Sequence, residues 1–360
     1  MGQSRKGQYL KGVFYFLTEV NESGKGGNYF CPIKQSIKTK QLKMKAAVYD
    51  QYGAPEVLQV KEAEKPMPKD NEILIKIKAT AVNSGDVRLR KADPFAVRFI
   101  FGLMKPRIKI LGTVFSGEVE SVGKDVKLFK VGDSVFGHTD MSFGAYAEYI
   151  CIPENGSVAI KPANVSHKEA AVIPFGGVTA LHFIKKAAIK PGQKVLVVGA
   201  SGAVGSAAVQ LAKSFGANVT GVSSTANMDL VKSIGADHFI DYTKEDFTQN
   251  GETYDVIFDT VKTIDVGKGI KSLHKNGIMI LSAAGMSEMI QGLWISKTSS
   301  VKVMTGVISH TASDILFLKN LITTDQYKPV IDRTYALDQI AEAHAYVEKG
   351  HKKGNVAIEI

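Results

Sequence analysis

Two kinds of hydrophobic pattern divide the chain. Between residues 44 and about 172, short segments of alternating apolar and polar residues are separated by Gly, Pro and Asp turns. Alternation of this kind predicts strands with one buried face. We therefore expect an all-β, barrel-like domain that opens with a strand at Met44 and contains further strands at 72–79, 112–122 and 146–153.

After residue 174 the pattern changes to strands alternating with helices. The strands are continuously apolar, which is typical of a parallel sheet with helices on both faces. We therefore predict an α/β fold with a doubly wound parallel sheet, followed from about residue 311 by a helix at 337–348 and a last strand at 355–360. The sheet strands are expected at 194–198, 218–222, 256–259, 278–282 and 301–306, with helices at 203–215 and 229–234.

A glycine-rich segment lies between the strand 194–198 and the helix 203–215. Its glycines depart by one position from the pattern GxGxxG. A dinucleotide needs such a loop, because its pyrophosphate binds the amides at the helix N-terminus and larger side chains would block the approach. A plain tight turn is the alternative. The predicted cofactor contacts in the loop are Gly199, Ala200, Ser201, Gly202, Ala203, Val204 and Gly205.

The end of the next strand indicates which dinucleotide binds. A carboxylate there would bind the adenosine 2′-hydroxyl and repel a 2′-phosphate. Hydroxyls of Ser223, Ser224 and Thr225 stand there instead, and Asp229 comes a turn later. We predict NADP(H) rather than NAD(H). Because no Arg or Lys neighbours these residues in the sequence, a simple helix-capping role remains the alternative.

Composition and charge exclude several classes of protein. Of 360 residues, 44% are hydrophobic and 22% charged, so the chain can bury a large core. Residues 1–43 carry +6 of the net charge of +10, and the rest is near neutral for its size. We expect no nucleic-acid partner and no membrane-spanning helix. The basic extension 1–43, expected to be poorly ordered, is either an organelle-targeting leader or upstream sequence fused before the natural start, and we favour the second.

The two cysteines limit metal chemistry and location. Cys31 and Cys151 allow no disulfide framework, which favours a reducing, cytoplasmic compartment. A four-cysteine zinc lobe is impossible, so any metal would need His and carboxylate ligands. The eight histidines are scattered singly along the chain. We predict no metal site.

Several blocks resemble the medium-chain dehydrogenase/reductase superfamily, and specifically its zinc-independent quinone oxidoreductase branch, to which zeta-crystallin belongs. The resemblance covers about residues 44–360. It implies a GroES-like catalytic domain at 44–172, completed by 311–360, around a Rossmann NADP-binding domain at 173–310. The active site would lie in the cleft between them, and a homodimer is expected. The matching blocks are the glycine loop, 81–87, 117–123, 131–137 and 144–149.

The resemblance also bears on the chemistry. Zinc-dependent relatives have Cys where this chain has Asn83, and Gly-His-Glu where it has Gly-Thr-Val at 112–114. Without a metal, a conjugated acceptor is favoured, because hydride addition to it leaves a delocalised negative charge. We predict NADPH-dependent reduction of quinones or α,β-unsaturated carbonyls. The alternatives are an alkenal or enoyl-thioester reductase, or a non-catalytic NADPH-binding regulatory protein.

Candidate site residues follow. Asn83 and Tyr146 are the catalytic candidates, although Asn83 can be a turn residue and Tyr146, like Trp294, a core residue. Asp86 is expected to orient its loop. The apolar stretch 95–104 either covers a hydrophobic substrate or packs in the core. By resemblance and by position at strand ends, the further predicted cofactor contacts are Thr179, Tyr242, Asp259, Thr260, Ser282, Ala283 and Asn355.

Overall fold

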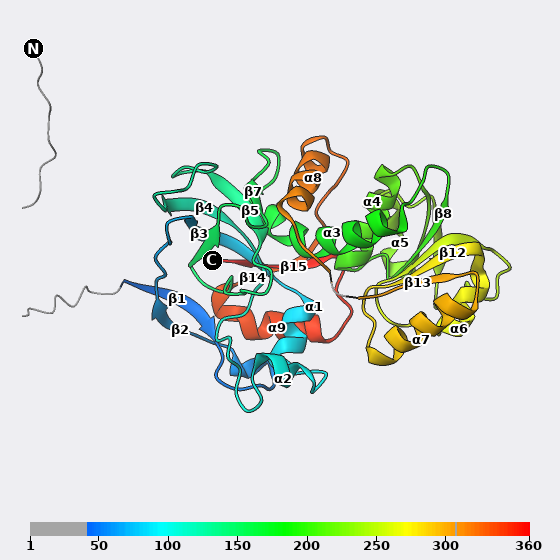
Figure 1. The fold of residues 1–360 in the computed structure, drawn as a ribbon, viewed down its shortest axis with the longest axis horizontal. Helices are drawn as coiled ribbons and strands as arrows, with labels where there is room; N and C mark the ends of the chain where they lie inside the picture. The colour runs from blue at the N-terminus through cyan, green and yellow to red at the C-terminus, as the bar shows by residue number, and fades with distance from the viewer. Residues whose placement is uncertain (1–41, 307) are drawn as a thin grey trace, which may run out of the picture. The chain divides into compact units, whose positions relative to one another are not determined.

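The computed structural model describes residues 42–306 and 308–360 (Figure 1). The predicted extension 1–43 therefore lies almost entirely outside the described residues. The first described strand begins at Lys43, which confirms the strand expected at Met44. Within the described residues, no helix is both long enough and apolar enough to cross a membrane.

The N-terminal half forms a mainly antiparallel sheet, as predicted. The last described strand, β15 (Asn355–Glu359), pairs with β3 (Glu72–Val82), so segments from both ends of the described chain build one domain. A separate hairpin joins β1 (Lys43–Val48) to β2 (Gln59–Glu64), and β6 (Tyr149–Pro153) pairs with β3. The order across the main sheet is β14 (Ile331–Ala336), β15 (Asn355–Glu359), β3 (Glu72–Val82), β4 (Val114–Val122), β5 (Ser134–His138) and β7 (Val158–Ile160).

This domain is not all-β, in contrast to the prediction. Two short helices, α1 (Ser84–Lys91) and α2 (Val97–Phe101), follow β3. Helix α9 (Ile340–Glu348) packs against α1, at the position where the sequence predicted a helix. Periodicity missed α1 and α2 because they are short and α1 is largely polar. Single 3-10 turns lie at Pro55–Val57, Thr225–Asn227, Ile270–Ser272 and Leu337–Gln339.

The second sheet has six strands, all parallel. All five predicted strands are present, within a few residues of their expected bounds, and β10 is an addition. The order corresponds to the dinucleotide-binding arrangement 3-2-1-4-5-6. Across the sheet the strands are β10 (His238–Asp241), β9 (Asn218–Ser223), β8 (Lys194–Val198), β11 (Tyr254–Asp259), β12 (Leu273–Leu281) and β13 (Lys302–Met304).

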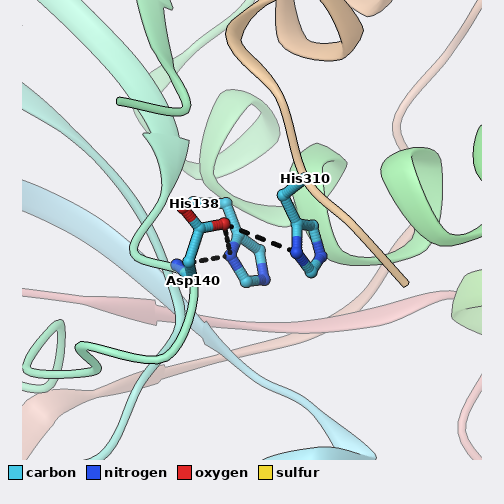
Figure 2. A group of neighbouring side chains, drawn as sticks. All are labelled: His138, Asp140 and His310. Carbon is cyan, nitrogen blue, oxygen red and sulfur yellow. Dashed lines mark hydrogen bonds and ion pairs between the residues drawn. The ribbon is translucent and has the colours of Figure 1, made fainter. Parts of the chain in front are cut away.

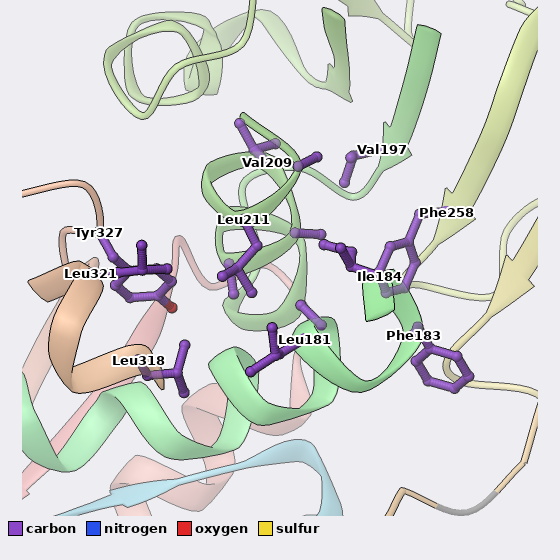
Figure 3. Packing of buried hydrophobic residues seen from close by; sticks show 14 of the residues in the cluster. Leu181, Phe183, Ile184, Val197, Val209, Leu211, Phe258, Leu318, Leu321 and Tyr327 are labelled. Carbon is purple, nitrogen blue, oxygen red and sulfur yellow. The ribbon is translucent and has the colours of Figure 1, made fainter. Parts of the chain in front are cut away.

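Helices cover both faces of this sheet, as the continuous apolar strands predicted. Val195 and Val197 of β8 belong to one buried cluster, and Leu196 and Val198 belong to another. Figure 3 shows part of the first cluster, in which Leu181, Leu211 and Leu318 come from three different helices. The helices of the sheet and its connections are α4 (Ala203–Ser214), α5 (Met228–Ser233), α6 (Val266–Gly269), α7 (Met286–Thr298) and α8 (Ala312–Thr323).

A 21-residue helix, α3 (His167–Ala187), joins the two sheets. Ser166 caps its first turn and Glu169 completes the capping box. Pro174 lies inside this helix, and the predicted domain boundary between residues 172 and 173 falls within it. Helix α3 contacts β3, β4 and β15 on one side and α4 on the other. It therefore forms a rigid connection between the two predicted domains.

Candidate active site

The glycine loop lies between β8 and α4, as predicted. Gly199 follows the strand with φ of +78°, a left-handed conformation that favours glycine. The amide of Gly202 donates to the Gly199 carbonyl at 3.0 Å and closes the turn. Helix α4 begins directly afterwards, so its free N-terminal amides face the loop.

Gly199, Gly202 and Gly205 have different roles, which become clear from what a Cβ atom at each position would contact. A Cβ on Gly205 would lie 2.0 Å from the Gly199 carbonyl oxygen, so Gly205 is required for packing. A Cβ on Gly202 would meet only that same oxygen, at 3.5 Å, within the described part of the chain. The fold itself thus leaves space at Gly202. This is the glycine whose backbone a pyrophosphate approaches, so the loop fits the predicted cofactor.

Polar side chains gather beside the loop at the end of β9. The hydroxyls of Ser201 and Ser223 lie 2.9 Å apart. The amide of Asn227 donates to both, at 3.1 and 3.0 Å, and reaches Ser224 at 3.3 Å. Its Oδ1 atom is buried without a hydrogen-bond partner among the described residues. Asn227 was missed in the sequence because a turn Asn is common.

A basic residue also reaches this cluster, from the far end of the sequence. The Nζ atom of Lys353 donates to the Ala226 carbonyl at 3.3 Å. The chain there is fixed to the glycine loop, because the Gly354 amide donates to the Ser201 carbonyl at 2.6 Å. No Arg or Lys neighbours residues 223–225 in the sequence, but the fold brings Lys353 to Ala226, the next residue along the chain. Lys353 was not among the predicted contacts, although Asn355, two residues later, was.

The predicted contact Thr225 has a different partner. Its hydroxyl donates to Asp241, whose carboxylate also accepts from the amide and hydroxyl of Thr243, at 2.9 and 2.7 Å. These hydrogen bonds, with Thr225 first, lower the pKa of Asp241 to about 2. Lys244 lies 3.7 Å away and offsets part of its charge. Asp241 is thus a saturated carboxylate beside the cluster, and Thr225 is the residue of the predicted set that is least free to bind a ligand.

The predicted contacts on later strands mainly hold loops. Asp259 is buried and accepts from the amides of Val261 and Lys262, both at 2.9 Å. Burial raises the pKa of Asp259 above its usual value. The Thr260 hydroxyl donates to the Val198 carbonyl at 2.8 Å. The Ser282 hydroxyl donates to the Asp259 carbonyl at 3.2 Å, and Ala283 follows it at the same edge of the sheet.

The remaining predicted cofactor contacts occupy three other places. Thr179 is buried in α3 and donates to the Phe175 carbonyl at 2.6 Å. Tyr242 is 63% exposed, and its amide donates to the Ser223 carbonyl at 3.3 Å. Asn355 is buried and its amide donates to the Val330 carbonyl at 3.0 Å. Tyr242 therefore lies at the edge of the hydroxyl cluster, while Asn355 anchors the C-terminal strand.

Asn83 and Thr113 lie side by side, and the resemblance places both where zinc-dependent relatives have metal ligands. Asn83 directly follows β3 and Thr113 directly precedes β4, and the side-chain amide of Asn83 donates to the Thr113 hydroxyl at 3.4 Å. Asn83 is also the N-cap of α1 and is almost fully buried. Phe175 of α3 is near, 3.8 Å from a Cβ placed on Gly85. An amide and a hydroxyl are poor zinc ligands, so this site does not fit a catalytic zinc.

Tyr146 does not reach an open site. Its ring is fully buried, and a Cβ on Gly112 would lie 2.5 Å from it. Its hydroxyl donates to Asp86 Oδ2 at 3.0 Å, and the same oxygen accepts from the backbone amide of Asn83 at 3.0 Å. Burial raises the pKa of Asp86 to about 6 and that of Tyr146 well above its usual value. Tyr146 thus reaches Asn83 only through Asp86, and Asp86 orients the loop as predicted.

One cluster was not predicted, because the histidines are far apart in the sequence. Figure 2 shows His138 and His310 beside Asp140. The Nδ1 atom of each histidine lies 3.4 Å from Asp140 Oδ1, and the rings stack with centroids 4.0 Å apart and an angle of 14°. Burial and the neighbouring His138 lower the pKa of His310 to about 4. The cluster is connected to Thr113 because the Thr139 amide donates to the Thr113 carbonyl at 2.7 Å.

The nitrogen–oxygen distances in this cluster are suitable for a metal ion, but the orientation of the two imidazole rings is not. Nitrogen and oxygen atoms 3.4 Å apart match neighbouring ligands of a small ion bound at about 2 Å. An imidazole nitrogen binds an ion in its own ring plane, whereas a point between two stacked rings lies outside both planes. His138 Nδ1 also accepts from the Asp140 amide at 2.8 Å. The observed arrangement therefore favours a stacked pair of histidines beside a carboxylate rather than a metal site.

The chain is similar to known oxidoreductases. Residues 69–162 match the alcohol dehydrogenase GroES-like domain family, and residues 234–358 match the zinc-binding dehydrogenase family. The 2-methylene-furan-3-one reductase of Solanum lycopersicum is 34% identical, with 88% of this chain and 79% of that protein covered. The chloroplastic NADPH-dependent alkenal/one oxidoreductase of Arabidopsis thaliana is 31% identical over the same shares.

A solved structure extends the similarity to the fold. The quinone oxidoreductase of Coxiella burnetii matches with a TM-score of 0.80 and 29% identity, covering 89% of this chain and all of that one. Both halves of the present fold therefore have counterparts in one known architecture. The zinc-binding name belongs to the family, and the amide of Asn83 and the hydroxyl of Thr113 are poor zinc ligands.

Proposed function

Since the chain belongs to the medium-chain dehydrogenase/reductase superfamily and is one of its oxidoreductases, we propose that it reduces quinones or α,β-unsaturated carbonyls with NADPH and without zinc. The observation that carries the proposal is the pair of Asn83 and Thr113, 3.4 Å apart, at the positions of the lost metal ligands. An amide and a hydroxyl can donate hydrogen bonds to a carbonyl oxygen.

The choice of acceptor follows from these donors. Bound NADPH supplies a hydride from the nicotinamide C4 atom. An acceptor that receives it becomes negatively charged at oxygen, and an isolated alkoxide needs strong stabilisation. In a quinone or enone the charge spreads over the conjugated system, so the hydrogen bonds of Asn83 and Thr113 can suffice. The proton that completes the reduction comes from water.

The cofactor side of the proposal depends on the cluster beside the glycine loop. Ser201, Ser223 and Ser224 offer hydroxyls, and Lys353 adds a positive charge next to Ala226. Phosphate is bound by this combination of hydroxyls and a base. Among the described residues, the carboxylate beside this cluster is that of Asp241, and it is saturated by Thr225 and Thr243. These contacts favour NADP(H) over NAD(H).

The test is NADPH oxidation with a panel of acceptors. A short-chain quinone, an alkenal, an enoyl thioester and a saturated ketone separate the proposed activity from the alkenal and enoyl-thioester alternatives. We expect turnover with the conjugated acceptors that a chelator leaves unchanged. Turnover limited to saturated substrates and abolished by chelation would refute the proposal. NADPH binding without turnover of any acceptor would favour a regulatory role.

We also propose a homodimer and a cytoplasmic location. Strand β13 is an edge of the parallel sheet, and Ile290, Leu293 and Trp294 of the neighbouring helix α7 are each more than 60% exposed. A second copy could pair with this edge and cover these side chains. Light scattering of the purified protein tests the dimer. Cell fractionation tests the location, since the Arabidopsis relative is named as chloroplastic.

A further inference from the structure

The segment 95–104, which includes α2, exposes five large apolar side chains. Their exposed fractions are 59% for Phe95, 69% for Phe99, 68% for Ile100, 55% for Leu103 and 86% for Met104. Single exposed apolar residues are common, but five within ten residues form a patch of the kind that binds a partner. Core packing, one of the two expectations for this stretch, is therefore wrong for these five side chains.

Contacts with Tyr52 and Phe143 hold the segment 95–104 in place. Phe101 turns inward and meets Phe143 edge to face, with ring centroids 5.8 Å apart. The Tyr52 hydroxyl donates to the Gly102 carbonyl at 2.8 Å. Gly102 has φ of +123°, and a Cβ there would lie 2.1 Å from the Lys105 carbonyl oxygen. The tight turn at Gly102 therefore presents the apolar residues on both its sides to solvent.

The same part of the chain is strongly basic. Residues 88–109 contain seven Lys and Arg residues and one acid, Asp93. Arg90, Lys91 and Lys109 are paired with acids, and Arg90 is fully buried. Lys105 and Arg107 are exposed and follow Leu103 and Met104 directly. We call Lys105 and Arg107 the basic rim. Exposed apolar side chains next to exposed basic residues are typical of surfaces that insert shallowly into an anionic bilayer.

We propose that this α2 surface docks on an anionic lipid membrane; it consists of Phe95, Phe99, Ile100, Leu103, Met104, Lys105 and Arg107. The positive charge of the basic rim disfavours two other partners, residues 1–43 and a second copy of the chain. Residues 1–43 carry a net charge of +6, so they would be repelled by the basic rim. A second copy would bring an identical basic rim against the first. Phosphate headgroups complement the rim, and acyl chains accept the apolar side chains.

Docking would also bring the enzyme to lipophilic acceptors. A quinone with a long apolar tail is concentrated in membranes, so a membrane-bound reductase meets it there. This link rests on the proposed function, but the docking itself is a binding event that does not need turnover. Failure of one therefore does not imply failure of the other.

The experiment is co-sedimentation of the full chain with lipid vesicles. We expect binding to vesicles of phosphatidylcholine mixed with phosphatidylglycerol, little binding to phosphatidylcholine alone, and release as salt screens the charges. The double variants K105E/R107E and F99S/I100S should each weaken binding at least about tenfold. The matched control K127E/K130E changes the same charge on the exposed loop after β4 and should bind as the unchanged protein does.

Three results would overturn the proposal. The first is equal binding to both vesicle types, or none. The second is a change of oligomeric state in F99S/I100S, measured by light scattering, with vesicle binding intact, which would assign the patch to a second copy. The third is an increased KM for a short-chain, water-soluble quinone with vesicle binding intact, which would assign the patch to substrate. Circular dichroism of each variant checks that it is folded.

Discussion

The hydroxyl of Tyr146 donates to the carboxylate of Asp86 at 3.0 Å inside the core of the catalytic domain. The same carboxylate oxygen accepts the backbone amide of Asn83. Tyr146 is therefore connected to Asn83 through the Asp86 carboxylate, and we assign it as a positioning residue. Asn83 is the residue whose side chain is near the proposed acceptor site.

Asn83→Ala should lower kcat with a quinone or enone by about 10- to 100-fold, because a hydrogen bond to a charged oxygen contributes about 1.5–3 kcal/mol. Tyr146→Phe should lower kcat by less than about tenfold and reduce the free energy of unfolding by about 1.5–3 kcal/mol, since one hydrogen bond to the Asp86 carboxylate is lost. Steady-state kinetics and urea unfolding measure both. If Tyr146→Phe is the more damaging change to kcat, the assignment of roles is reversed.

The two glycines Gly202 and Gly205 should respond differently to alanine. Gly202→Ala leaves the packing unchanged but places a methyl group in the path of the pyrophosphate, so we expect NADPH to bind at least about tenfold more weakly at an almost unchanged melting temperature. Gly205→Ala should cost about 1–3 kcal/mol of stability or more, because its Cβ would lie 2.0 Å from a carbonyl oxygen. Calorimetric titration and thermal melting distinguish them. Unaffected binding in a folded Gly202→Ala variant contradicts the assigned site.

Lys353→Ala should raise the KM for NADPH about tenfold and leave the KM for NADH unchanged, since only NADPH has the 2′-phosphate that a charged donor would bind. Lys349→Ala is the control, because Lys349 is an exposed lysine of the same C-terminal segment. Both are measured by NAD(P)H oxidation with one quinone. An equal effect on the two cofactors would indicate that Lys353 acts only through the backbone of the loop.

His344 should make the fold sensitive to acid. Both of its ring nitrogens are buried and have no hydrogen-bond partner within the described residues. Burial, and then Arg90, lower the pKa of His344 to about 3 from a usual value of 6.5. The unfolded chain thus binds the extra proton first, and stability falls as the pH drops from 6.5 towards 3, by about 1.4 kcal/mol per pH unit.

His344→Phe should remove this part of the pH dependence, since a phenyl ring cannot bind a proton and can keep the edge contact with Tyr146. Melting temperatures between pH 7 and 5 test it, with the exposed His351→Gln as control. Asp86, whose pKa is raised, contributes a slope of the opposite sign between pH 4 and 6. An unchanged slope in His344→Phe would mean that another group causes the acid sensitivity.

Some elements of the fold could be predicted from short sequence segments, and others could not. The strands of the parallel sheet were predictable because each is a short, continuous apolar run between turns. Helix α3 was missed because Pro174 stands inside it, and proline usually ends a helix. The apolar stretch 95–104 has the same composition whether it packs inside or faces solvent, so only the structure could place it.

The sequence by itself determined the glycine loop and the alternation of strands and helices around it, because each depends on residue types at fixed positions along a short segment. The tertiary structure decided that Lys353 meets Ala226 and that His138 stacks on His310. Those pairs are 127 and 172 residues apart. Their meeting is a property of how two sheets and a shared helix pack, and no local pattern encodes it.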